Sequence, residues 1–101
     1  MKGAYFVLLY YCYTNISNPN KFRENHHLFC INNNLKGRVI ISKEGINGTI
    51  SGKKNDCENY MKKIYSDKRF ENVEFKIAKH SKNVFNKLNV RLKSEIVNSG
   101  I

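Results

Sequence analysis

The side chains best suited to binding a partner are basic, and they concentrate near the end of the chain. Between Phe75 and Ser94 the sequence contains no acidic residue. The six basic residues of this stretch are Lys76, Lys79, Lys82, Lys87, Arg91 and Lys93. Such a series can contact phosphate groups without reading a base sequence. A solvated strand edge would give the same pattern, so both interpretations stay open.

The overall charge is strongly positive. The chain has 18 Lys and Arg against 8 Asp and Glu, a formal net charge of +10. A positive field of this size favours polyanions such as nucleic acid or an anionic membrane surface. The sequence is also rich in lysine and asparagine, a bias that an AT-rich genome would produce without any ligand. Composition alone supports the two explanations equally.

Residues that could build a catalytic or metal centre are poorly arranged for it. The sequence has no paired-carboxylate, Ser-His-Asp or Walker pattern. The wide spacing of Cys12, Cys30 and Cys57 does not suit zinc, and their odd number argues against a disulfide framework. The adjacent His26 and His27 point in different directions on a helix and cannot bind one metal together. We expect no metal or cofactor in this chain, and a reducing, cytoplasmic compartment.

Six elements must position these side chains. Hydrophobic periodicity predicts strands at 4–13, 36–42, 46–51 and 72–79 and helices at 19–33 and 54–66. This β-α-β-β-α-β order predicts an α+β, ferredoxin-like fold, with an antiparallel sheet and two helices on one face. In the last strand of the series, Val73, Phe75 and Ile77 should face the core. The first apolar run is too short to cross a bilayer, so we expect no membrane partner.

An extra C-terminal strand is expected after these six elements. Residues 88–97 alternate between apolar and polar side chains, with Val90, Leu92 and Ile96 directed inward. We therefore predict a ferredoxin-like domain at 1–87. Residues 88–101 would be a closing strand and the start of a linker to a further domain.

The turn between the two central strands is the most informative local feature. The segment 43–49 reads Lys43-Glu44-Gly45-Ile46-Asn47-Gly48-Thr49. Its two glycines mark backbone that is expected to need positive φ angles. Glu44, Asn47 and Thr49 would then shape a hairpin tip that faces a neighbouring domain or a substrate. The alternative is an ordinary hairpin turn with no further role.

Two functional classes that share this topology fit poorly. Acylphosphatases need a glycine-rich phosphate loop with an arginine between the first strand and the first helix. Residues 14–19 contain neither, and Arg23 lies one helical turn further on. RNA-recognition motifs stack bases on aromatic side chains of the sheet. Because residues 47–51 include no aromatic residue, that mode is weakly supported.

Two segments together resemble one family. Residues 36–52 are similar to the hairpin of the rhodanese-related tRNA uridine hydroxylases, and residues 88–97 resemble the strand that closes their N-terminal domain. The resemblance implies an acylphosphatase-like N-terminal domain followed by a rhodanese domain. The full-length protein would hydroxylate the wobble uridine of tRNA to 5-hydroxyuridine, with molecular oxygen as co-substrate. The catalytic cysteine belongs to the rhodanese part, and none of Cys12, Cys30 or Cys57 matches it.

We therefore expect an accessory domain that is not catalytic by itself and that helps to hold tRNA. The candidate tRNA contacts are Arg38, Lys43, Lys76, Lys79, Lys87, Arg91 and Lys93, and the candidate positioning residues are Glu44, Asn47 and Thr49. One alternative is a purely structural module that packs on the rhodanese domain. Another is a small phosphatase of the acylphosphatase kind.

Overall fold

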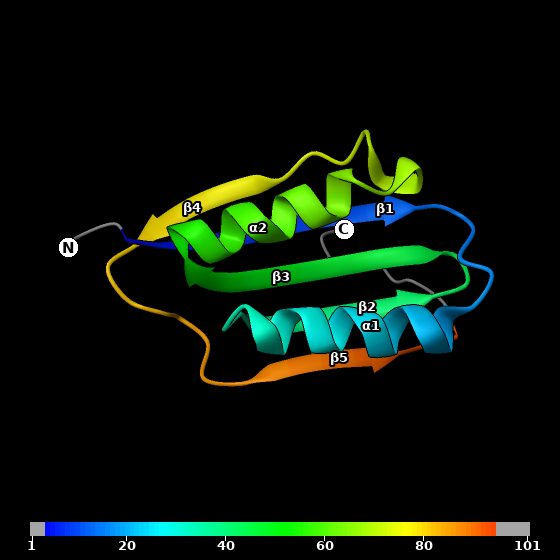
Figure 1. Ribbon diagram of the computed structural model, residues 1–101, viewed down its shortest axis with the longest axis horizontal. Coiled ribbons are helices and arrows are strands. Elements are labelled where there is room, and N and C mark those ends of the chain that lie inside the picture. The colour runs from blue at the N-terminus through cyan, green and yellow to red at the C-terminus, as the bar shows by residue number, and fades with distance from the viewer. Residues whose placement is uncertain (1–3, 95–101) are drawn as a thin grey trace.

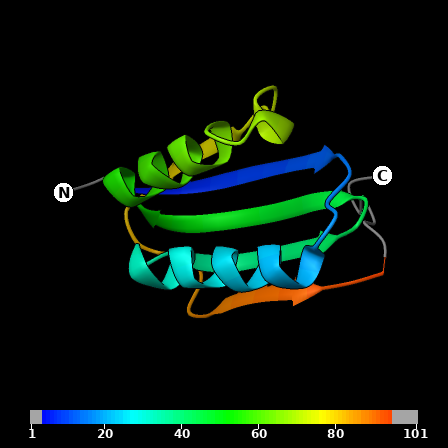
Figure 2. The ribbon, with the colours of Figure 1, turned by 45° about the vertical axis from the view of Figure 1, so that its right-hand side comes forward.

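Two helices cover one face of a five-stranded sheet in the computed structural model, which describes residues 4–94 (Figure 1). The elements in chain order are β1 (Tyr5–Tyr13), α1 (Pro19–Asn32), β2 (Lys36–Ser42), β3 (Gly45–Lys53), α2 (Lys54–Tyr65), the short 3-10 helix η1 (Lys68–Phe70), β4 (Lys76–His80) and β5 (Leu88–Leu92). Figure 2 shows the two helices side by side on the same face of the sheet.

The strand order confirms the predicted topology. The strands lie in the order β4-β1-β3-β2-β5. The first four pair antiparallel, as the ferredoxin-like fold requires, and β5 adds parallel to β2. α1 contacts β2 and β5, and α2 contacts β1 and β3. The predicted α+β fold with an extra C-terminal strand is therefore correct.

The helices begin and end where their side chains predict. The Asn18 side chain accepts a hydrogen bond from the Lys21 N–H at 3.2 Å, and Pro19 occupies the first turn of α1. After α1, Asn34 adopts the left-handed conformation with φ of 57°. In α2, Cys57, Tyr60 and Ile64 form the buried stripe, and they pack on the sheet together with Leu8 and Ile50.

The hairpin is tighter than the sequence suggested. Its turn consists of Lys43 and Glu44 alone, and β3 already begins at Gly45. Gly45 has a φ of +148°, and a Cβ there would lie 2.0 Å from the carbonyl oxygen of Cys12. Gly48 lies inside β3 and has no positive φ, so the prediction of a second turn glycine is wrong. A residue without a side chain is needed at this position, because a Cβ there would lie 2.7 Å from the Tyr10 ring.

The last two strands are shorter than predicted. β4 begins at Lys76, and all five of its residues are exposed. Ile77 pairs with Leu8 on the helix side but is 49% exposed, because β4 is an edge strand that neither helix covers. β5 ends at Leu92, which is 40% exposed, whereas Val90 is buried as expected. Ile96 and the end of the predicted 88–97 strand lie outside the described residues.

Candidate functional site

The sheet face opposite the helices, which we call the open face, carries a mixed aromatic and basic surface. Side chains alternate along β1, so Leu8 and Tyr10 enter the core while Leu9, Tyr11 and Tyr13 lie on the open face. The exposed fractions of Leu9, Tyr11 and Tyr13 are 44%, 54% and 56%. Three large side chains of one strand thus remain outside the core.

The strand register arranges the open face in rows that cross the sheet. One row runs from β4 to β5 through Lys76, Leu9, Thr49, Arg38 and Asn89. The next row runs through Tyr11, Asn47, Ile40 and Arg91. Because neighbouring strands are about 4.8 Å apart, the first row spans about 19 Å from end to end. The rows place aromatic, amide and guanidinium groups on one surface.

The open face is basic because none of the five strands contains an acidic residue. Three of the predicted tRNA contacts, Arg38, Lys76 and Arg91, lie on this face. Lys36 pairs with Ser51 and Lys53 pairs with Tyr5, so the register adds these two cations to the same surface. The face therefore presents five strand cations with no carboxylate among them.

Other predicted contacts lie elsewhere. Lys79 pairs with Phe6 and so lies on the helix side of β4. Lys43 and Glu44 form the hairpin turn at one end of the sheet. Lys87 and Lys93 flank β5: the Lys87 carbonyl accepts from the Gly37 N–H, and the Lys93 N–H donates to the Ile41 carbonyl, both at 2.9 Å. The sequence stretch 76–93 is therefore divided between surfaces and does not form one stripe.

The hairpin turn is held in place by the loop that follows β1. The N–H groups of Thr14 and Ile16 donate to the carbonyls of Glu44 and Lys43, both at 2.9 Å. The Ser42 hydroxyl accepts from the Glu44 N–H at 3.0 Å. An acylphosphatase would bind phosphate in this loop. Here two backbone N–H groups of the loop are already bonded to the hairpin turn. Asn47 and Thr49, expected at the tip, lie instead within β3 on the open face, both half-buried.

The loop between β4 and β5 covers one end of the open face and leaves the other end accessible. The Ser51 hydroxyl donates to the Asn83 side-chain oxygen at 2.5 Å, and Ser51 and its partner Val7 are buried. At the other end, the pairing of β1 with β4 stops at Leu9 and Lys76. A cleft of about 1000 Å³ lies there beside Leu9 and Tyr11, and Glu74 is the one acidic residue in its lining.

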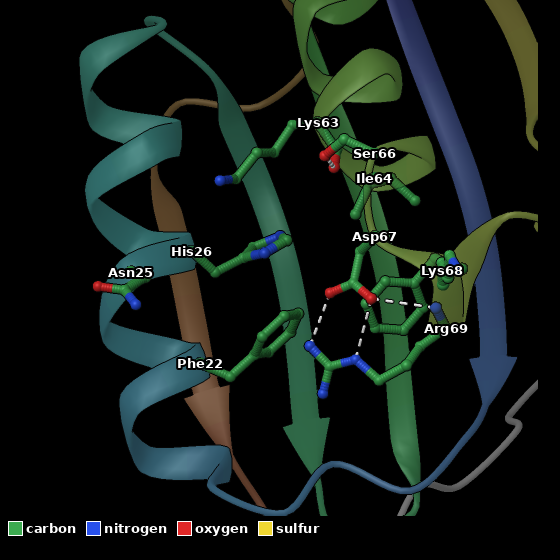
Figure 3. A pocket seen from close by; sticks show the side chains of 10 residues that line it. Phe22, Asn25, His26, Lys63, Ile64, Ser66, Asp67, Lys68 and Arg69 are labelled. Atoms are coloured by element: carbon green, nitrogen blue, oxygen red, sulfur yellow. Dashed lines mark hydrogen bonds and ion pairs between the residues drawn. The ribbon is translucent and has the colours of Figure 1, made fainter.

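A second hollow lies between the two helices (Figure 3). It has a volume of about 460 Å³. Figure 3 shows Arg69 and Asp67 bonded to each other on one side of this groove, opposite Phe22 and His26 of α1. Arg69 donates two hydrogen bonds to the Asp67 carboxylate, at 3.0 and 2.7 Å, and these lower the pKa of that carboxyl. Its guanidinium also lies over the rings of Phe22 and Phe70. Arg69 is thus paired within the groove, which Lys63 and Lys68 also line.

Titratable groups inside the core are shielded and structural. The hydroxyls of Tyr10 and Tyr60 share a hydrogen bond, and His26 Nε2 bonds the Tyr60 hydroxyl at 2.7 Å. Burial, aided by the charge of Lys63, lowers the pKa of His26 to about 4. Burial raises the pKa of the Cys30 thiol to about 12. The side chains of Tyr10, Tyr60 and His26 thereby connect the two helices to β1.

The described residues offer little for metal or membrane chemistry. Within residues 4–94, no three His, Cys, Asp or Glu side chains are grouped so that they could hold a metal ion. No helix in the same range is long and apolar enough to cross a membrane.

The rows of basic, aromatic and amide side chains on the open face are suited to binding an extended anionic partner.

Sequence reasoning missed three members of this surface: Tyr11, Tyr13 and Lys53. The signal was available for the two tyrosines, because Leu9, Tyr11 and Tyr13 recur every second residue and must share one face of a strand. The comparison with RNA-recognition motifs looked for base-stacking aromatic residues on β3, whereas the exposed aromatic residues lie on β1. Lys53 could be placed on this surface only once the pairing of β3 with β1 was known.

Comparison with known proteins gives a consistent result. Residues 5–96 match the model of the UPF0176 acylphosphatase-like domain. Proteins named tRNA uridine(34) hydroxylase are similar: that of Cytophaga hutchinsonii is 52% identical over 96% of this chain, and that of Staphylococcus haemolyticus is 48% identical over 96%. That of Acholeplasma laidlawii is 47% identical over 97%. The chain spans 30 to 31% of the length of these curated relatives.

Solved structures share the fold at low sequence identity. The BLUF protein BlrB in its dark state superposes with a TM-score of 0.68 at 12% identity, covering 87% of this chain and 73% of that one. Full-length HypF in a phosphate- and nucleotide-bound form superposes with a TM-score of 0.53 at 16% identity, over 90% of this chain and 12% of HypF. At such identities the likeness establishes the architecture alone.

Proposed function

This chain belongs to the family of UPF0176 acylphosphatase-like domains, and we propose that it is the tRNA-holding accessory domain of a tRNA uridine(34) hydroxylase. Arg38, Lys76 and Arg91 contact tRNA phosphates from the open face. The hydroxylation itself takes place in a rhodanese domain of the longer protein, which uses molecular oxygen as co-substrate. The protein acts in the cytoplasm, where its tRNA substrate is found.

One observation carries the proposal: the open face gathers five strand cations, and no strand contributes a carboxylate. Among the acidic residues of 4–94, Glu74 lines the cleft beside Leu9 and Tyr11, Glu44 lies in the hairpin turn, and the others lie on the helices or in the segments beside them. Such a division of charge favours a polyanion on one side of the molecule. The tRNA substrate in the names of the relatives is a polyanion of this kind.

Binding of tRNA at two salt concentrations tests the proposal. If all five cations contact phosphates, affinity falls about 10²- to 10³-fold between about 50 and 200 mM salt, because each contact releases counterions. The double variant Arg38→Ala/Arg91→Ala should lose affinity and show a salt slope that is smaller by about 1.4 to 1.8. Failure of the chain to bind tRNA at about 50 mM salt would contradict the proposal.

A matched control separates the open face from net charge. Lys21 on α1 and Lys62 on α2 are exposed on the helix side. The double variant Lys21→Ala/Lys62→Ala removes the same charge as the open-face variant, so it should retain the salt slope of the unmodified chain. Equal losses in the two double variants would mean that charge alone drives binding.

A second candidate role is that of a structural module, which the exposed side chains of Leu9, Tyr11 and Tyr13 favour. In that role the open face packs on the rhodanese domain and orders its active site. The chain would then not bind tRNA, and Asn47→Ala in the full-length protein would lower hydroxylation without changing tRNA affinity.

A further inference from the structure

We propose that Tyr11 and Tyr13, on β1 at the accessible end of the open face, form a stacking platform for unpaired nucleobases. This inference rests on the proposed function, because it takes RNA as the ligand. It goes further by naming single-stranded nucleotides, and not the helical stems, as the part of the RNA that this surface reads.

The geometry of the two rings is suited to stacking. Tyr11 and Tyr13 are more than half exposed, and their ring centroids lie 6.0 Å apart with an interplanar angle of 69°. In this edge-to-face arrangement the edge of one ring meets one face of the other, so the pair leaves its remaining ring faces available to a base. Leu9 extends the same apolar strip by one position along β1. The cleft beside Leu9 and Tyr11 leaves this side of β1 open.

Polar and charged groups surround the rings on both sides. Asn47 is the registered neighbour of Tyr11, and Thr49 is that of Leu9. Arg38 and Arg91 follow at about 10 and 14 Å from β1, two and three strand spacings away. Lys76 lies on the opposite side of β1. A base placed on Tyr11 thus has long cationic side chains on both sides to receive its phosphates.

The chemistry of the face favours unpaired RNA over a duplex or an apolar protein partner. Base pairing and stacking in a duplex hide the faces of the bases, whereas unpaired nucleotides expose them to aromatic side chains. A protein partner would have to neutralise five strand cations that no strand carboxylate balances. A single-stranded RNA can stack its bases on the tyrosine rings and place its phosphates beside the cations.

The chain offers a clean spectroscopic test, because it contains no tryptophan. The variant Tyr11→Trp places a single tryptophan on the platform, and its emission can be excited separately from that of the remaining tyrosines. Titration with a short single-stranded oligonucleotide should quench its emission, and a duplex of the same length should not. Quenching by the duplex to the same extent would overturn the inference.

Affinity measurements complete the test. The variant Tyr11→Leu/Tyr13→Leu should weaken single-strand binding by about 5- to 150-fold for each base stacked. Tyr11→Phe/Tyr13→Phe keeps the rings and should retain the affinity. The control Leu28→Ala removes an exposed apolar side chain from α1 and should change nothing. A thermal unfolding curve for each variant verifies that it is folded.

The outcomes separate this inference from the proposed function. If the leucine variant binds single strands as well as the unmodified chain does, and binding still weakens with salt, the platform is wrong and the phosphate contacts stand. If the chain binds no RNA at about 50 mM salt, both fail. A dimer that dissociates on Tyr11→Leu would show that a second copy covers the face, which also overturns the inference.

Discussion

Acidification should destabilise this fold through one buried histidine. His26 is 6% exposed, and burial together with Lys63 lowers its pKa from 6.5 to about 4. The unfolded chain keeps the ordinary pKa, so between these pH values it binds more protons than the folded protein does. The stabilisation is therefore fully present above pH 6.5 and is lost as the pH falls toward 4.

The complete shift corresponds to about 3 kcal/mol of unfolding free energy, of which about 2 kcal/mol is lost between pH 7 and pH 5. Urea denaturation at both pH values measures this loss for the unmodified chain and for His26→Gln. Glutamine can still bond the Tyr60 hydroxyl but does not titrate, while His27 and His80 are common to both proteins. The unmodified chain should lose about 2 kcal/mol more than the variant. Equal losses would refute the argument.

Four further predictions rest on local geometry. Gly48→Ala forces a Cβ to within 2.7 Å of the Tyr10 ring and should lower the unfolding free energy by about 1 to 3 kcal/mol in chemical denaturation. Gly45→Ala should cost more than Gly48→Ala, because it adds a positive φ to a clash with backbone; a smaller loss would contradict the assigned turn. Arg69→Ala breaks a partly exposed ion pair with Asp67 and the contacts with the Phe22 and Phe70 rings, and should cost about 1 to 2 kcal/mol in chemical denaturation; no loss would contradict these contacts. An acyl phosphate assay should detect no turnover, since two amides of the loop after β1 are bonded to the hairpin; measurable hydrolysis would overturn this.

Local signals in the sequence predicted most of the fold. Asn18 and Pro19 marked the start of α1, and the stripe of Cys57, Tyr60 and Ile64 marked α2, because caps and helical periodicity depend only on nearby residues. The order of elements then restricted the sheet to one topology.

The errors arose where distant segments meet. Gly48 resembled a turn residue, but a glycine is needed there because the Tyr10 ring, 38 positions earlier in the chain, leaves no room for a side chain. Lys79 belongs to a basic stretch, yet its pairing with Phe6 places it on the helix side. The strand residues of the open face could be grouped only once the register of β1, β3, β2 and β5 was known. Periodicity reveals which residues share a face of one strand, but not which strands are neighbours.

The most direct test of the central claim is to map the tRNA-binding surface by NMR. Amide resonances of the 101-residue chain are followed during titration with tRNA at low salt. Binding at the open face predicts that Arg38, Thr49 and Asn89, which lie in one row across the sheet, shift together, while Asn25 and Lys62 on the helices do not. Shifts concentrated on the helices, with Arg38, Thr49 and Asn89 unchanged, would contradict the account.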